Sequence, residues 1–102
     1  MTSPQEGPLD EAGIASAPVS HGAYRLWDRE RVVFVGVTSG ARTLRTELMR
    51  HWRGDFGPTQ RASHFECLAA ATAGEAHEHY LSLYLSSGLR AEPGTGVARR
   101  EG

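Results

Sequence analysis

The sequence lacks several features that would place it in a familiar class. It has one cysteine, Cys67, which excludes an internal disulfide and a zinc site built from several cysteines. It has no lysine, and we interpret its eleven arginines mainly as a genomic bias. No apolar run approaches the ~18 residues that span a bilayer, and no basic start precedes an apolar block as in a signal peptide. We therefore expect a cytoplasmic protein with no membrane partner.

What is present suits one small domain. The 102 residues are 39% apolar and 23% charged, as in an ordinary globular protein. Residues 1–20 and 91–102 are rich in Pro, Gly, Ser and Ala, with too few large apolar side chains to offset the entropy of ordering. We predict a disordered leader, a folded domain over residues 21–90, and a disordered tail.

The charge is unevenly distributed along the chain. The formal net charge of −1 hides a basic middle, because residues 29–61 carry seven arginines against three acids. The flanking segments 1–28 and 62–102 are both net acidic. A local basic face attracts phosphate even when the whole chain is neutral, although a solvated helix face is the simpler explanation.

Hydrophobic periodicity predicts five elements. Alternating apolar residues indicate strands, a stripe formed by Leu44, Leu48 and Trp52 indicates a helix, and Thr72 with Glu75 forms a capping-box pattern before a second helix. The predicted strands are 23–27, 31–37 and 63–69, and the predicted helices are 41–53 and 73–87. We predict an α+β domain with a three-stranded antiparallel sheet flanked by helices, in the order β-β-α-β-α.

This order carries a set of short motifs. The first two strands contain Gly22-Ala23-Tyr24 and Phe34-Val35-Gly36, and the first helix contains the run LRTELMRHW over residues 44–52. The last helix has Glu75-Ala76 near its start and Tyr84 further along, and Leu89-Arg90 follows it. Order and motifs together resemble the GIY-YIG nuclease superfamily, and the resemblance covers residues 22–90.

The resemblance implies metal-assisted phosphodiester hydrolysis, which needs a group that activates water, a cation at the developing charge, and an oxygen ligand for a hard metal. Tyr24 matches the first tyrosine, but Phe34 stands where the second tyrosine is expected. Glu47 stands at the arginine position, with Arg45 as a substitute two residues away.

Tyr80, on the last helix, stands where the family has its metal-binding glutamate. Glu78 is the nearest carboxylate in sequence and the candidate metal ligand, but it projects about 200° around the helix from Tyr80. The resemblance therefore implies a degraded active site.

We accordingly expect a non-catalytic domain that binds DNA or RNA without a cofactor, through Arg42, Arg45 and Arg53. One alternative is an active endonuclease that uses Tyr24, Arg45 and His51 with Mg²⁺ or Mn²⁺. Another is a protein-interaction module that docks on a protein partner.

Three placements follow from this interpretation. Tyr24 and Phe34 should lie side by side on an antiparallel hairpin, on the sheet face that meets the N-terminal half of the first helix. Glu47 and His51, four residues apart, should pair on the helix surface. Trp52 should lie in the core rather than act as a platform for a nucleobase.

Two other groups are better explained as structural. Cys67 alternates with apolar residues in a predicted strand, which indicates a buried thiol. His77 and His79 are two apart on a helix and cannot face one ion, so a zinc site with His64 and Cys67 is not expected.

Overall fold

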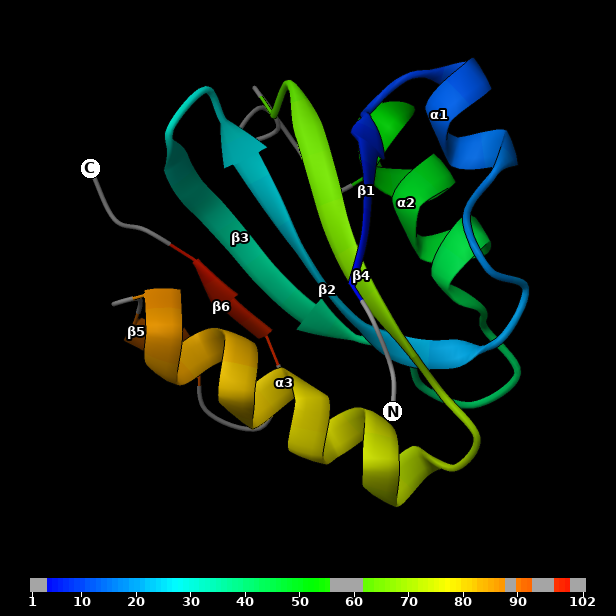
Figure 1. Cartoon of the computed structure of the whole chain (residues 1–102), viewed down its shortest axis with the longest axis vertical. Helices are drawn as coiled ribbons and strands as arrows, with labels where there is room; N and C mark the ends of the chain where they lie inside the picture. The colour runs from blue at the N-terminus through cyan, green and yellow to red at the C-terminus, as the bar shows by residue number, and fades with distance from the viewer. Residues whose placement is uncertain (1–3, 56–61, 88–89, 93–96, 100–102) are drawn as a thin grey trace.

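The computed structural model describes residues 4–55, 62–87, 90–92 and 97–99. Three helices pack on one antiparallel sheet whose strand order is β1-β4-β2-β3-β6-β5 (Figure 1). The elements are β1 (Gln5–Pro8), α1 (Glu11–Ala15), β2 (His21–Asp28), β3 (Arg31–Val37), α2 (Leu44–Trp52), β4 (His64–Ala70), α3 (Ala73–Ser87), β5 (Arg90–Glu92) and β6 (Val97–Arg99).

The predicted α+β class is confirmed, but the sheet is larger than the three strands expected and the element order is longer. The predicted series corresponds to β2, β3, α2, β4 and α3. β1 and α1 precede it, and β5 and β6 follow it. β1 pairs with β4 and β6 pairs with β3, the outer members of the predicted sheet, and β5 pairs with β6. The added strands thereby satisfy backbone N–H and C=O groups that an exposed strand edge would leave free.

The predicted disordered leader differs most from the structure. β1 pairs with β4, and Asp10 caps α1 by accepting a 2.8 Å hydrogen bond from the Gly13 amide. Leu9, Ile14 and Ala17 are buried in the core, with Ile14 fully enclosed. Average composition hid this segment, because three well-placed apolar side chains are enough to dock it.

The predicted disordered tail falls partly on β5 and β6, which extend the sheet beyond β3. These two short strands pair with each other as an antiparallel hairpin. Residues 93–96 and 100–102 of that tail lie outside the described residues.

Local signals explain where the two longer helices begin. The Thr72 hydroxyl accepts a 3.1 Å hydrogen bond from the Glu75 amide, so α3 begins at Ala73 as predicted. α2 begins at Leu44 and not at Ala41, because Thr43 is its N-cap and accepts from the Thr46 amide. Arg42 therefore precedes the helix.

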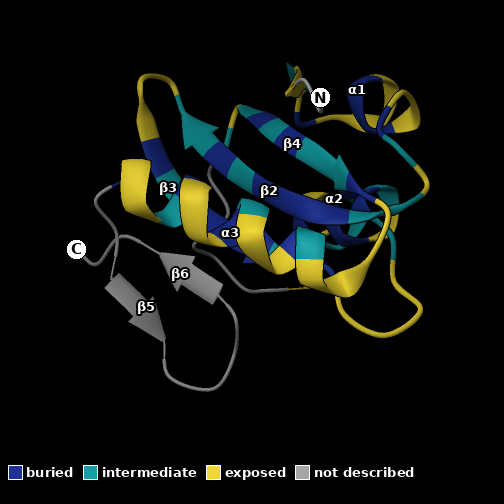
Figure 2. Ribbon diagram, turned by 60° about the horizontal axis from the view of Figure 1, so that its bottom comes forward, coloured by how far each residue is buried: buried dark blue, intermediate teal, exposed yellow. Residues whose placement is uncertain are grey.

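The helices divide between the two faces of the sheet (Figure 1). α1 and α2 cover the face that carries Tyr24, Leu26, Phe34 and Phe65, together with Cys67, whose thiol is buried as expected. α3 covers the other face. Strand residues alternate between the two faces, so both sides of the central strands are buried (Figure 2). No helix in the described part of the chain has the length and apolarity to cross a membrane.

Candidate functional site

The hairpin of β2 and β3 presents two aromatic rings to α2. The strands are antiparallel, and the Tyr24 and Phe34 rings are stacked with centroids 6.0 Å apart, which confirms their predicted placement side by side. Tyr24 lies opposite Gly36 in the register. A Cβ at Gly36 would lie 2.7 Å from the Tyr24 ring and hydroxyl, so glycine at this position allows the phenol to lie across β3.

The Tyr24 hydroxyl reaches α2 at His51. Its oxygen lies 2.8 Å from His51 Nε2. The Phe34 ring meets the imidazole edge-on, with the two ring centroids 4.3 Å apart. The predicted sheet face is the one that meets α2, and Tyr24 and Phe34 share a core cluster with Leu44 of its first turn. Their polar contact, however, is with His51 in the last turn of α2. Tyr24 and His51 are 2% and 1% exposed, so the polar pair is enclosed in the core.

Burial changes the acidity of Tyr24. Desolvation raises the pKa of Tyr24 well above its ordinary value, and the nearby Glu47 carboxylate raises it further. Arg50 and Arg42 act in the opposite direction but do not cancel the effect. Tyr24 is therefore a neutral phenol near pH 7 and a poor source of phenolate.

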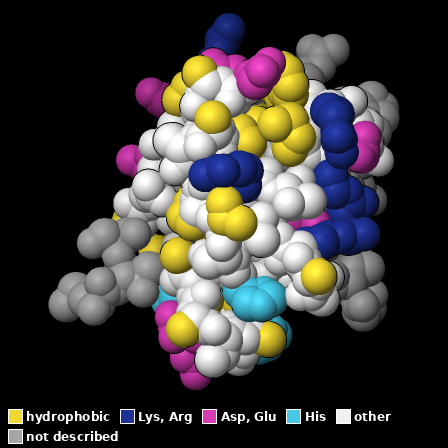
Figure 3. Space-filling model, turned by 90° about the vertical axis from the view of Figure 1, so that its right-hand side faces the viewer, with side chains coloured by type: hydrophobic (Ala, Val, Ile, Leu, Met, Phe, Trp, Pro, Cys, Tyr) yellow, Lys and Arg dark blue, Asp and Glu magenta, His cyan; other side chains and the backbone are white. Residues whose placement is uncertain are grey.

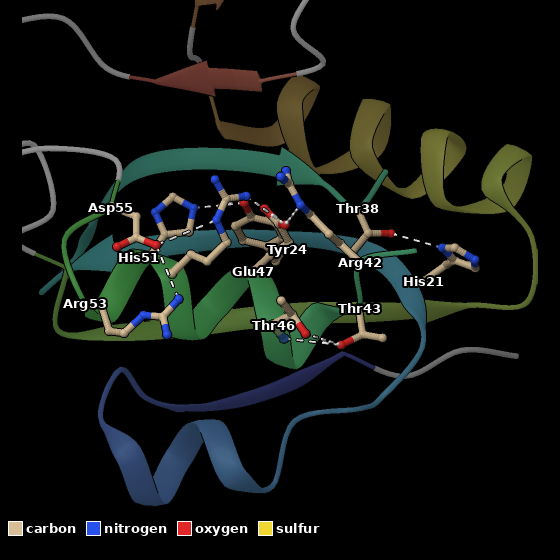
Figure 4. A network of polar contacts seen from close by, with 11 residues as sticks. His21, Tyr24, Thr38, Arg42, Thr43, Thr46, Glu47, His51, Arg53 and Asp55 are labelled. Atoms are coloured by element: carbon tan, nitrogen blue, oxygen red, sulfur yellow. Dashed lines mark hydrogen bonds and ion pairs between the residues drawn. The ribbon is translucent and has the colours of Figure 1, made fainter. Parts of the chain in front are cut away.

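Glu47 is buried beside this pair and begins a chain of ion pairs. Its Oε1 lies 3.5 Å from Arg42 Nε and 3.2 Å from Arg50 Nη1. The expected surface pair of Glu47 with His51 is wrong, because both side chains are buried. The carboxylate is directed to the two arginines instead (Figure 4).

This series of ion pairs continues from Arg50 to Asp55, just beyond the end of α2. Asp55 Oδ2 lies 3.9 Å from Arg50 Nε and 3.3 Å from Arg53 Nη2. We call Arg42, Glu47, Arg50, Asp55 and Arg53 the arginine ladder; it alternates in sign and carries a net charge of +1.

The ladder has an exposed side. The Arg42 and Arg53 side chains at its two ends are 52% and 56% exposed, whereas Arg50 between them is 23% exposed. Arginine side chains gather along one edge of the face that carries α1 and α2, with acidic side chains among them (Figure 3). The ladder thus offers two cations to solvent at its ends.

Arg45 does not join this group. Its guanidinium donates two hydrogen bonds to the Ala17 carbonyl, at 3.1 and 2.8 Å, just beyond the end of α1. The predicted triplet Arg42, Arg45 and Arg53 is therefore divided, and Arg50 lies in the ladder in place of Arg45. The sequence prediction did not include Arg50, although its spacing of three residues from Glu47 on a helix was an available signal.

Glu78 is also separate from Tyr24. It is exposed on α3, on the opposite face of the sheet. In the described part of the chain, no three His, Cys, Asp or Glu side chains are grouped so that they could hold a metal ion. The carboxylate that acts on Tyr24 is that of Glu47, and two arginines already pair with it. These residues do not fit the Mg²⁺ or Mn²⁺ site that the resemblance implies.

Trp52 departs from the predicted core. The buried residues of α2 are Leu44, Glu47, Leu48 and His51, and this stripe leaves Trp52 to one side. Its side chain is 43% exposed at the last residue of the helix, next to the C-cap Arg53.

No family model matches the chain, and no curated protein matches it.

Proposed function

We propose that this chain is a catalytically inactive GIY-YIG-like domain that binds nucleic acid through its arginine ladder. The observation that carries the proposal is the pair of exposed guanidiniums, Arg42 and Arg53, at the ends of a fixed row of charges. Guanidinium groups bind phosphate oxygens in a planar, two-pronged geometry that lysine cannot reproduce.

The inactive state is supported by what each catalytic candidate does instead. Tyr24 and His51 are enclosed and bound to each other, and Phe34 has no hydroxyl to position water. Arg45 is engaged with α1, and Glu78 lies across the sheet. A general base must come within hydrogen-bonding reach of its substrate, which an enclosed phenol cannot do.

The binding mode follows from the exposure of the ladder. Its buried carboxylate, Glu47, offsets part of the positive charge, so the attraction to phosphate is short-ranged and modest. We expect non-specific affinity of about micromolar or weaker at physiological salt. DNA and RNA both present the phosphates that such a surface recognises.

Fluorescence anisotropy with labelled oligonucleotides across a salt series tests the proposal. We expect binding that weakens with salt, and a loss of about one to two units of log–log slope in the Arg42→Gln/Arg53→Gln variant. Arg31→Gln is the matched control, because Arg31 is an exposed arginine at the start of β3 and is not part of the ladder. Absence of binding at low salt contradicts the proposal and favours a protein-interaction module.

A nuclease assay with Mg²⁺ or Mn²⁺ tests the inactive state separately. We expect no cleavage of plasmid or branched DNA, since loss of one transition-state stabiliser alone typically lowers rates by about 10²–10³. Metal-dependent nicking that disappears in Tyr24→Phe would support the active endonuclease instead.

A further inference from the structure

The surface beside Arg53 contains an aromatic side chain that the core does not use. Trp52 is the last residue of α2 and is 43% exposed, although the helix buries four other side chains against the sheet. Leu44 and Leu48 of α2 pack in the core with Tyr24, Leu26 and Phe34. The indole is therefore only partly shielded from water by the fold.

Arg53 follows Trp52 directly and is the outermost cation of the ladder. Its side chain is 56% exposed, and its Nη2 lies 3.3 Å from Asp55, which holds the guanidinium at the end of the helix (Figure 4). Adjacent residues have Cα atoms about 3.8 Å apart, so the exposed ring and the exposed guanidinium project from the same end of α2. Stacking surface and phosphate donor thus occur together.

We propose that Trp52 is a stacking platform for an unpaired base, and that the ligand of the ladder is single-stranded nucleic acid. This inference rests on the proposed function, because the ladder must first bind phosphate. Proteins that bind single strands combine a positive surface along the backbone with aromatic rings on which bases stack. Duplex bases are already stacked on one another and present no free face to Trp52.

The charge of the surface supports this choice of occupant. The ladder is net +1, so phosphate contacts alone give weak binding to either form. A stacked base adds affinity that does not depend on charge and is available from a single strand. If Trp52 instead anchors a protein partner, its substitution should not affect single-strand and duplex binding differently.

The experiment uses the full chain, a labelled oligothymidine of about 20 nucleotides, and the matching duplex. We expect Trp52→Leu to weaken single-strand binding by about tenfold and to leave duplex binding nearly unchanged. Trp52→Phe should retain most of the affinity because it keeps an aromatic face. Leu85→Ala is the control for removing an exposed apolar side chain, since Leu85 is 78% exposed on α3, across the sheet.

A second measurement does not depend on affinity. The chain has two tryptophans, Trp27 and Trp52. A base stacked on Trp52 should quench the intrinsic fluorescence of the wild type, and Trp52→Phe should abolish that quenching. If Arg42→Gln/Arg53→Gln weakens binding while Trp52→Leu changes neither affinity nor quenching, the stacking inference is wrong and the ladder still stands. If the wild type binds no oligonucleotide, both proposals fail. Equal losses for single strand and duplex also overturn the stacking inference.

Discussion

The two faces of the sheet are stabilised by different chemistry. On the α3 face, Ala23, Val35 and Leu83 form an apolar layer with Val32 and Tyr80. On the α2 face the buried layer includes charged and hydrogen-bonding groups, namely Tyr24, Glu47 and His51. Buried polar groups cost free energy unless each is satisfied. The α3 face also holds buried hydroxyls, such as that of Ser87, but the buried carboxylate of Glu47 lies on the α2 face.

The α3 face also holds an ion pair, at its margin. Arg25 pairs with Glu66 on β4 and donates to the hydroxyls of Ser86 and Ser87 at the end of α3. Its guanidinium also lies 5.0 Å from the Trp27 ring centroid. These contacts join β2, β4 and α3, and they give the Arg25 guanidinium partners within the fold. The arginine ladder, in contrast, ends in two exposed guanidiniums. Under the proposed function, the exposed arginines place the binding surface on the α2 face, whereas the contacts of Arg25 serve the stability of the domain.

The largest expected effect tests whether both layers stabilise the fold. Leu48→Ala should lower the free energy of unfolding by about 2–5 kcal/mol, because Leu48 is fully buried between α2 and the sheet. Leu83→Ala should have an effect in the same range on the α3 face. Denaturant unfolding measures both, with the half-exposed Leu81→Ala as a control within about 0.5 kcal/mol of wild type. A negligible cost for Leu83→Ala would contradict the stabilising role of the α3 face.

The next effect tests the buried carboxylate of the α2 face. Glu47→Gln keeps the shape of the side chain and removes the charge that holds Arg42 and Arg50. We expect the free energy of unfolding to fall by about 1–3 kcal/mol. Asp55→Asn is the control, because Asp55 is 42% exposed and its pairs should contribute little. If both variants unfold alike, the buried end of the ladder has no special role.

These contacts show where sequence reasoning succeeded and where it could not. The hairpin and α3 were predictable because local signals define them: alternating apolar residues in β2 and β3, and the Thr72 cap. β1 and α1 were not, since their order depends on Leu9 and Ile14 docking into a core that the sequence does not display.

The same limit applies to the candidate site. The family resemblance brought Tyr24 and His51 into one hypothesis, and the structure joins them by a hydrogen bond. Arg45 was misplaced because its partner, the Ala17 carbonyl, belongs to the segment expected to be disordered. The ladder was missed because it requires the helix to begin after Arg42, which depends on Thr43 as the cap.

A third prediction concerns alkaline pH, where the α2 face should weaken. Burial raises the pKa of the Cys67 thiol from 9.0 to about 11, and the Glu66 carboxylate adds to the shift. The folded state then keeps a proton that the unfolded state loses. Stability is therefore complete below pH 9.0 and falls, by up to about 1.4 kcal/mol per pH unit, as pH rises toward 11.

Unfolding curves recorded across this pH range measure the effect. Cys67→Ala should flatten the decline, apart from a constant offset for the lost sulfur. The raised pKa of Tyr24 has the same sign and leaves a residual decline at still higher pH. Parallel declines in wild type and Cys67→Ala would show that the thiol does not contribute.

The smallest effect refines the binding side of the comparison. Asp55 takes up part of the charge of Arg50 and Arg53, so Asp55→Asn changes the ladder from +1 to +2. If the ladder binds phosphate, the variant should bind oligonucleotides more tightly, by up to about fivefold at low salt, which matches the small free energy of an exposed ion pair. Glu30→Gln removes the same charge from the exposed β2–β3 turn and controls for net charge. The gain should shrink in an Arg53→Gln background, because Arg53 is the cation that Asp55→Asn releases. Equal gains from Glu30→Gln and Asp55→Asn would mean that the overall charge of the protein, and not the ladder, governs binding.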